Sequence, residues 1–172
     1  MKKLISAFIV LTIILSCAST ALASSSSLGM TTGELFVMFN NCLDEMESLG
    51  LWHYHLELSA KDKDRPSVVS PLTQHCSIEV KQENGTVKSF KIVSDEKKDD
   101  STSDTRLAEI YICFMAAMLL TNDIFTEDNA MEYLSEVLGD NQEHTYGDVT
   151  YRFVTTQPFS TIVGLEVTPA EK

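Results

Sequence analysis

The chain carries little positive charge, since its 172 residues include 13 lysines and arginines against 25 aspartates and glutamates, for a formal net charge of −12. A surface this acidic repels phosphate backbones and anionic lipid headgroups. Two charged runs, residues 61–65 and 95–100, mix both signs and are typical of solvated loops. The composition therefore argues against nucleic acid as a partner and against electrostatic binding to a membrane.

The N-terminal apolar run is too short to cross a bilayer. Residues 4–15 follow two lysines and precede small residues, which is the layout of a secretory signal. Small residues up to Ala23 favour a signal over residues 1–23 and a soluble chain from Ser24. Alternatively, "ILSC" is a lipobox, and the signal is cleaved before a lipidated Cys17. In both cases we expect an extracytoplasmic chain, secreted or in the cell envelope, with a membrane contact only through a lipid on Cys17.

The rest of the chain is long enough for one domain with its own core. Loss of the signal removes two lysines, so that the net charge of −12 becomes −14. We expect a serine-rich linker over residues 24–30 and a single domain over residues 31–169.

Sequence patterns associated with catalysis are missing: there is no G-x-S-x-G, H-E-x-x-H, P-loop or C-x-x-C pattern. His75 and Cys76 are adjacent, but neighbours on a strand face opposite sides, so this histidine cannot activate this thiol. His144 falls in an expected loop and has no evident partner. We therefore assign no catalytic residue and no cofactor, and we do not expect an enzyme.

The chain has four cysteines. Cys17 leaves with the signal or carries the lipid, so an odd number remains in the domain: Cys42, Cys76 and Cys113. All three fall on or near apolar faces, where a free cysteine behaves as a small hydrophobic residue. Export permits one disulfide, for which Cys42 and Cys113 are the expected pair, but the sequence leaves the disulfide state open.

Three helices are expected from apolar residues at three- and four-residue spacing. The first begins with the capping box "TTGE", residues 31–34, and ends at Gly50. The second begins near Ser103 and is apolar around most of its circumference, so it should be the most buried. The third begins after Thr126 and ends at Gly139.

Five strands are expected from alternation of apolar and polar residues. The first, residues 51–59, directs Trp52, Tyr54 and Leu56 toward the core. In the hairpin around "ENG", a two-residue turn would place Ile78 opposite Lys91, so we expect a three-residue loop that places Ile78 opposite Phe90 and Cys76 opposite Ile92. The last hairpin covers residues 149–167.

Together these elements predict an α+β fold, a two-layer domain with an antiparallel sheet of about five strands and helices packed on one face. The order of helices and strands is repeated along the chain, which suggests two halves of similar design. The two halves share no convincing sequence identity.

Five polar side chains should share the other face of this sheet. They are His53, His55, Glu57, His75 and Glu79. If their two strands pair antiparallel, His53 lies beside Glu79 and Glu57 beside His75. Imidazole and carboxylate groups together suit zinc or a similar ion, although polar residues on an exposed face need no ligand. These five are the candidate ligand- or metal-binding residues, and the identity of a metal stays unknown.

An exported, non-enzymatic binding or interaction domain is the function that needs the fewest specific sequence features. Its ligand would be an extracytoplasmic protein or a small molecule of unknown identity. One alternative is a metal- or small-molecule-binding protein that uses the polar histidine face. The other is a hydrolase without a recognisable motif.

Overall fold

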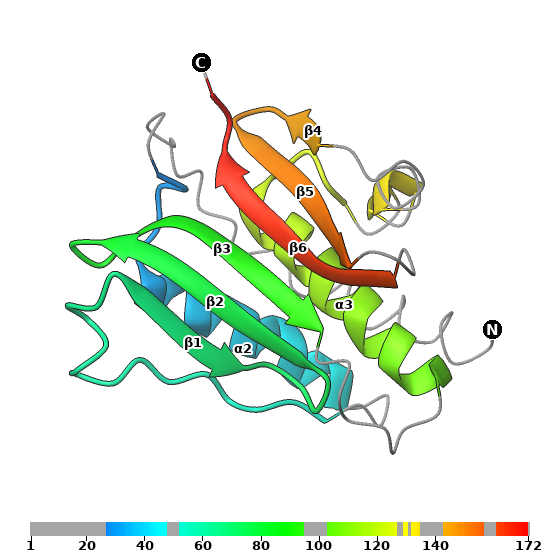
Figure 1. The fold of residues 1–172 in the computed structure, drawn as a ribbon, viewed down its shortest axis with the longest axis horizontal. Coiled ribbons are helices and arrows are strands. Elements are labelled where there is room, and N and C mark those ends of the chain that lie inside the picture. Colours follow the sequence, from blue (N-terminus) through cyan, green and yellow to red (C-terminus); the bar gives the residue numbers. More distant parts are fainter. Residues whose placement is uncertain are drawn as a thin grey trace.

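The structure is a computed structural model that describes residues 27–47, 52–94, 103–126, 129–130, 132–134, 143–156 and 161–171. Its helices and strands are α2 (Thr32–Glu47), β1 (Ser67–Pro71), β2 (Cys76–Glu83), β3 (Thr86–Ser94), α3 (Ser103–Thr121), β4 (Glu143–Tyr146), β5 (Val149–Thr156) and β6 (Thr161–Pro169) (Figure 1). Residues 129–130 and 132–134 are also helical. Within the described part of the chain, no helix is long and apolar enough to cross a membrane.

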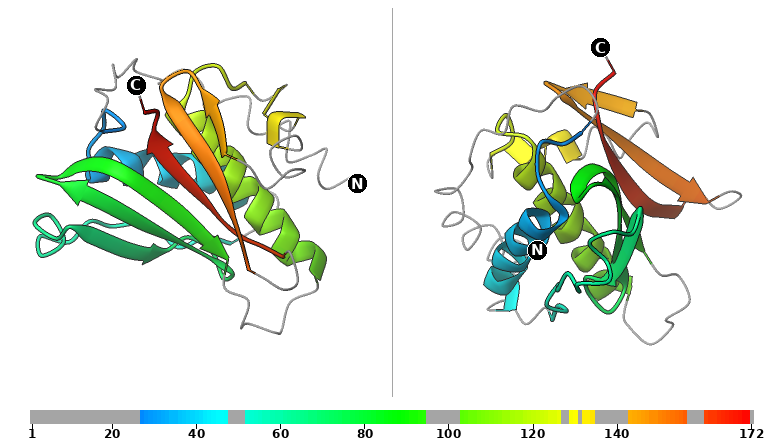
Figure 2. Two further views of the ribbon diagram at one scale, coloured as in Figure 1. Left: turned by 45° about the horizontal axis from the view of Figure 1, so that its top comes forward. Right: turned by 90° about the vertical axis from the view of Figure 1, so that its left-hand side faces the viewer.

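The six strands form one antiparallel sheet in the order β1-β2-β3-β6-β5-β4. Both α2 and α3 pack on the same side of this sheet, and no described helix covers the other side, which we term the open face (Figures 1 and 2). The predicted α+β class, with an antiparallel sheet and helices on one face, is confirmed.

Each half of the domain is a helix followed by three neighbouring antiparallel strands. The halves meet where β3 pairs with β6, at a seam that runs from Phe90 opposite Val167 to Val93 opposite Gly164. The two strands approach so closely at Gly164 that a Cβ atom there would lie 2.6 Å from the carbonyl oxygen of Ile92. A glycine is therefore required at this point of the seam.

The core fills the space between the sheet and the helices. The ring of Phe39 on α2 meets Phe90 on β3 edge-on, with centroids 5.9 Å apart, and Phe114 on α3 meets Phe153 on β5 at 5.5 Å. Except for Trp52 and Tyr54, the expected core residues with described side chains are buried: Phe39, Leu56, Ile78, Phe90, Phe114, Met118 and Leu165. The sequence thus identified most of this core from periodicity alone.

The predicted capping box at the start of α2 is confirmed. The Glu34 amide donates to the Thr31 hydroxyl at 3.2 Å, and the Thr31 amide donates to the Glu34 carboxylate at 2.7 Å. The hydrogen bonds that the Thr31 amide and hydroxyl donate to the Glu34 carboxylate lower the pKa of Glu34 below its usual value. The first turn of α2 is therefore held by local, reciprocal contacts.

We expect Thr31→Ala to lower the free energy of unfolding by about 0.5 to 2 kcal/mol, because the helix loses its N-cap oxygen.

The ionised Glu34 carboxylate is favoured in the folded state. Its contribution to the free energy of unfolding is therefore present above the unfolded pKa of Glu34 and is lost as the pH falls through the folded pKa. Denaturant unfolding of the wild type and of Glu34→Gln at acidic and neutral pH measures this. A stability difference between them that does not shrink at acidic pH would contradict the assignment.

The segment that precedes α2 differs from the sequence prediction. Residues 28–30, which were placed in the linker, are tied to β3, since the Leu28 amide donates to the Val87 carbonyl and the Val87 amide to the Met30 carbonyl, both at 2.9 Å. Leu28 is buried, so the folded part of the chain begins before Thr31. The expected helix ends at Gly50 and Gly139 lie outside the described residues.

The prediction of a strand over residues 51–59 was wrong. Residues 54–59 form no strand, and His53 makes only an isolated bridge to Thr73. Trp52, expected in the core, is 56% exposed, and Tyr54 is half-buried. The missed strands are β1 and β4, and β4 contains His144, opposite Tyr151, where a loop was expected.

The β2–β3 hairpin has a different register from the predicted one. Asn84 and Gly85 form a two-residue turn, both with positive φ, of 53° and 77°. A bulge between Lys81 and Gln82 then shifts the pairing so that Ile78 lies opposite Ile92, rather than opposite Lys91 or Phe90. The bulge keeps the apolar faces together without a longer loop.

The open face of the sheet carries a ladder of alternating charges. One residue from each of five successive strands lies in the same cross-strand row: Glu143, Arg152, Glu166, Lys91 and Glu79. Arg152 makes an ion pair with Glu166, and this contact raises the pKa of the guanidinium. Opposite charges at directly paired positions stabilise a sheet. These charged residues therefore stabilise the pairing of the strands, and a bound ligand is not needed to explain them.

Candidate functional site

The five candidate polar residues do not share one face. β2 pairs with β1, with Glu79 opposite Val69, so the predicted pairing of Glu79 with His53 was wrong. His53 and His75 are buried, whereas His55 and Glu57 are exposed and Glu79 belongs to the charge ladder of the open face. Across the residues that the structure describes, no three His, Cys, Asp or Glu side chains are grouped so that they could hold a metal ion.

His75 belongs to a buried polar cluster between the β1–β2 turn and α3. Its Nδ1 atom lies 2.9 Å from Oε2 of Glu109, and the two side chains are 1% and 6% exposed. The same carboxylate oxygen accepts from the Thr73 hydroxyl at 2.7 Å and from the His75 amide at 3.3 Å. Glu109 therefore fixes the turn against the helix.

A carboxylate on Nδ1 of a histidine is also the arrangement that orients a catalytic base. Here, however, the whole cluster lies in the interior, where a substrate has no access to His75. The Thr73 hydroxyl instead accepts from the amides of His75 and Cys76, at 3.2 and 3.0 Å. The geometry supports a structural role for this cluster.

The three cysteines that the structure describes, Cys42, Cys76 and Cys113, are all buried. A hydrogen bond to the side chain of Cys76, together with burial, raises the pKa of the Cys113 thiol on α3. The disulfide expected from the sequence, between Cys42 and Cys113, is not formed.

His53 anchors a short extended segment, residues 52–57, that runs beside α2. Its Nε2 atom lies 2.9 Å from Oδ1 of Asp44 on α2, and its own side chain is 5% exposed. On the sheet side, the Tyr54 amide donates to the Leu72 carbonyl at 2.8 Å. The segment is therefore fixed both to the helix and to the end of β1.

Asn40 holds the same segment as a neighbouring strand would. The Leu56 amide donates to Oδ1 of Asn40 at 2.7 Å, and Nδ2 of Asn40 donates to the Leu56 carbonyl at 2.9 Å. One buried amide side chain thereby satisfies both backbone groups of Leu56. Residues 52–57 are rigid in backbone although they form no strand.

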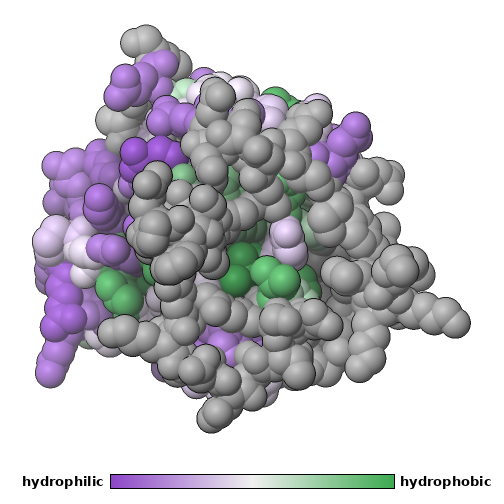
Figure 3. Space-filling model, turned by 45° about the vertical axis from the view of Figure 1, so that its right-hand side comes forward, coloured by the Kyte–Doolittle hydropathy of each residue, from purple (hydrophilic) through white to green (hydrophobic). Residues whose placement is uncertain are grey.

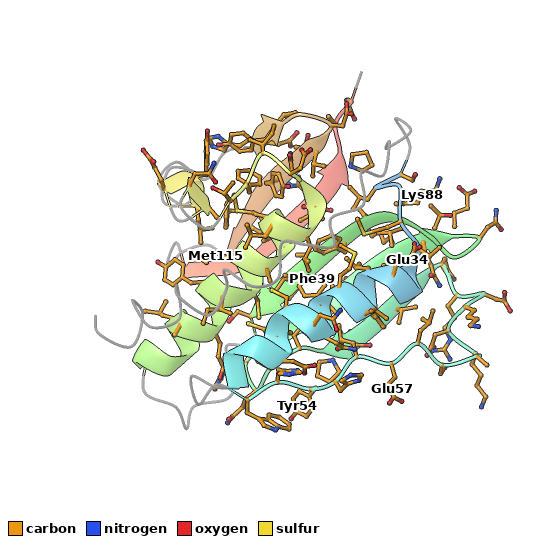
Figure 4. All side chains as sticks on the ribbon, turned by 180° about the vertical axis from the view of Figure 1, so that it is seen from behind. Glu34, Phe39, Tyr54, Glu57, Lys88 and Met115 are labelled. Carbon is orange, nitrogen blue, oxygen red and sulfur yellow. The ribbon has the colours of Figure 1, made fainter. Side chains whose placement is uncertain are left out.

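This fixed segment presents four side chains outward, Trp52, Tyr54, His55 and Glu57, which we term the Trp52 surface. The indole of Trp52 meets the Tyr54 ring edge-on, with centroids 4.2 Å apart. Tyr54 and Glu57 point away from the body of the molecule beside α2 (Figure 4). The Asp44 carboxylate, which is 57% exposed, contacts the segment through His53.

Exposed large apolar side chains are few among the described residues. They are Val37, Trp52, Val69, Leu107 and Ile124. Of these, only Trp52 is aromatic and packed against a second aromatic ring at the surface. Elsewhere, hydrophilic side chains cover the end of the sheet that carries the 59–66 loop and the β2–β3 turn, at the left of Figure 3.

Sequence reasoning missed Asn40 and Glu109, although both left a signal. Asn40 is a polar residue on the apolar stripe of the first helix, and Glu109 is the one charged residue in the apolar stretch over residues 107–120. A lone polar residue on a buried helix face indicates a buried hydrogen-bond partner. The sequence did not show which partners these would be.

Comparisons of the chain with protein-family models, with curated proteins and with solved structures found no match.

Proposed function

We propose that this chain is an exported, non-enzymatic binding domain that contacts its partner through the Trp52 surface. The observation that supports this is the exposure of Trp52, at 56%, with its ring packed on Tyr54. Tryptophan and tyrosine side chains at one place are typical of the few residues that dominate binding energy. The partner is an extracytoplasmic protein or a small ligand.

The rigidity of the segment supports the same proposal. Contacts to Asn40, Asp44 and Leu72 fix its backbone before any partner arrives. A surface that is already ordered loses less conformational entropy on binding than a flexible loop. The buried positions of His53 and His75 favour neither a metal site nor a hydrolase.

Export is supported by the layout of residues 1–23. The N-terminus of the chain recovered from cells tests it directly. A soluble chain that begins at Ser24, or a lipidated one that begins at Cys17, agrees with the proposal. A full-length chain that stays in the cytoplasm contradicts it.

The sharpest test of the surface places a photo-crosslinking amino acid at position 52 of the chain in its producing cells. We expect a defined crosslinked product from this position and none from position 69, where Val69 is exposed on the open face of the edge strand β1, opposite Glu79. With the partner identified and purified, Trp52→Ala should weaken binding at least ~30-fold, whereas Val69→Ala should not.

Trp52 is the only tryptophan of the chain, so its fluorescence reports on this surface alone. Titration with the purified partner should change the emission of the wild type. The free energy of unfolding of Trp52→Ala should stay within about 0.5 kcal/mol of the wild type, because the side chain is mostly exposed. Equal affinities for Trp52→Ala and Val69→Ala would refute the proposed surface.

A further inference from the structure

The part of the chain that contains α2 and the Trp52 surface is rich in carboxylates. Residues 31–60 include five aspartates and glutamates and neither a lysine nor an arginine. Glu57 is exposed, and the side chain of Asp44 is 57% exposed although its Oδ1 atom contacts His53. The aromatic rings of the Trp52 surface therefore belong to a stretch of the chain that carries exposed carboxylates and no strongly basic side chain.

The position of Asp44 on α2 adds to the negative potential beside this surface. Because α2 ends at Glu47, Asp44 lies in its last turn, and that turn holds no basic residue. The C-terminal end of a helix is the negative end of the helix dipole, which stabilises cations and is unfavourable for a carboxylate. A positive group bound beside Asp44 interacts favourably with both the carboxylate and the helix end.

The burial of residues 52–57 repeats every three residues. His53 and Leu56 are buried, whereas the residues that follow them, Tyr54 and Glu57, are half-buried and exposed. Three residues per turn is the period of an extended polyproline II segment, which places Tyr54 and Glu57 on the same side. Figure 4 shows both side chains pointing away from the body of the molecule. One side of the segment thus combines an aromatic ring with a carboxylate.

We propose that the partner of the Trp52 surface is a basic segment of another extracytoplasmic protein. An arginine side chain of this segment lies against Trp52 and Tyr54 and pairs with Glu57. A guanidinium group can stack on an aromatic ring and bind a carboxylate at the same time, and it is less strongly hydrated than an ammonium group. The inference rests on the proposed function, because it takes the Trp52 surface as the contact surface. A second copy of this chain is disfavoured as the partner, since it would bring the same carboxylates close together.

The test titrates the purified chain with three synthetic peptides of equal length, built from four repeats of Gly-Arg, Gly-Lys or Gly-Gln. Isothermal titration calorimetry at low salt measures the affinity, and the emission of Trp52 shows whether binding takes place at this surface. We expect the arginine peptide to bind at least ~3-fold more tightly than the lysine peptide, and the glutamine peptide to leave the emission unchanged. Equal affinities for the arginine and lysine peptides would overturn the inference.

Matched variants separate this surface from the general acidity of the chain. Glu57→Gln should weaken binding of the arginine peptide about 2- to 5-fold, which corresponds to one exposed ion pair. Glu143→Gln removes the same charge from an exposed position on β4, at the other edge of the sheet, and should leave the affinity unchanged. Trp52→Leu should weaken binding about as much as Glu57→Gln, because leucine is apolar but lacks the aromatic ring. Equal effects of Glu57→Gln and Glu143→Gln would contradict the proposed contact.

Crosslinking at position 52 distinguishes this inference from the proposed function. A crosslinked partner whose contacting segment holds no arginine would overturn the inference and retain the Trp52 surface as the binding surface. If no product is crosslinked in cells, but the arginine peptide still discriminates between Glu57→Gln and Glu143→Gln, the proposed function is contradicted and the preference for arginine is supported.

Discussion

Replacing Phe114 with alanine should lower the free energy of unfolding by about 3 to 5 kcal/mol. Phe114 is fully buried on α3, and its ring packs on Phe153 of β5 with centroids 5.5 Å apart. The change removes a large apolar side chain and leaves a cavity that neither the helix nor the sheet can close completely. Chemical denaturation monitored by circular dichroism measures the loss.

Leu107 offers the control for this experiment, since it lies on the same helix but is 49% exposed. Leu107→Ala should change the free energy of unfolding by no more than about 0.5 kcal/mol. Similar losses at both positions would show that the orientation of α3 is wrong. A smaller slope against denaturant in either variant would instead indicate a change in the unfolded state.

Removing the Glu109 carboxylate should be comparably costly. Oxygen Oε2 accepts from the Thr73 hydroxyl, the His75 amide and the His75 ring, all in the interior. Glu109→Ala takes away an acceptor that three buried donors share, and breaking a buried pair of this kind costs about 3 to 5 kcal/mol. Equilibrium unfolding at neutral pH measures it.

Glu109→Gln separates the loss of the acceptor from the loss of packing. Glutamine has nearly the same shape and keeps one carbonyl oxygen, so we expect it to be clearly more stable than Glu109→Ala. A Glu109→Ala, His75→Ala double variant should lose less than the sum of the two single changes, because each single change removes the same contact. Strict additivity would mean that the two side chains do not interact.

Features that depend on residues close together in the sequence were predicted correctly, whereas features that depend on longer-range contacts were not. The Thr31–Glu34 capping box and the apolar stripes that contain Phe39 and Phe114 depend on neighbours within a few residues, and all were predicted. A two-residue turn at Asn84 and Gly85 was considered from the sequence, but a three-residue loop was predicted instead, and that prediction was wrong. The observed register of this hairpin depends on a bulge at Lys81 and Gln82, which no local sequence pattern predicts.

The prediction that the candidate residues share one face of the sheet was wrong for a related reason. Residues 52–57 alternate as a strand does, yet their hydrogen-bond partner is the side chain of Asn40 instead of a neighbouring strand. His53 is consequently buried with its ring against the exposed Asp44 carboxylate, and Trp52 faces solvent. Such a side chain–backbone contact between distant residues leaves no periodic signal, so alternation alone assigned the two faces incorrectly.

The seam between β3 and β6 also bears on how the chain folds. Within each half, neighbouring strands follow one another along the chain, so their ladders close short loops. At the seam, Val93 pairs with Gly164, roughly 70 residues away, and the loop-closure entropy of that contact is correspondingly larger. The step that limits folding speed should therefore be the docking of two locally formed halves along this short ladder, whose closest approach depends on a residue without a side chain.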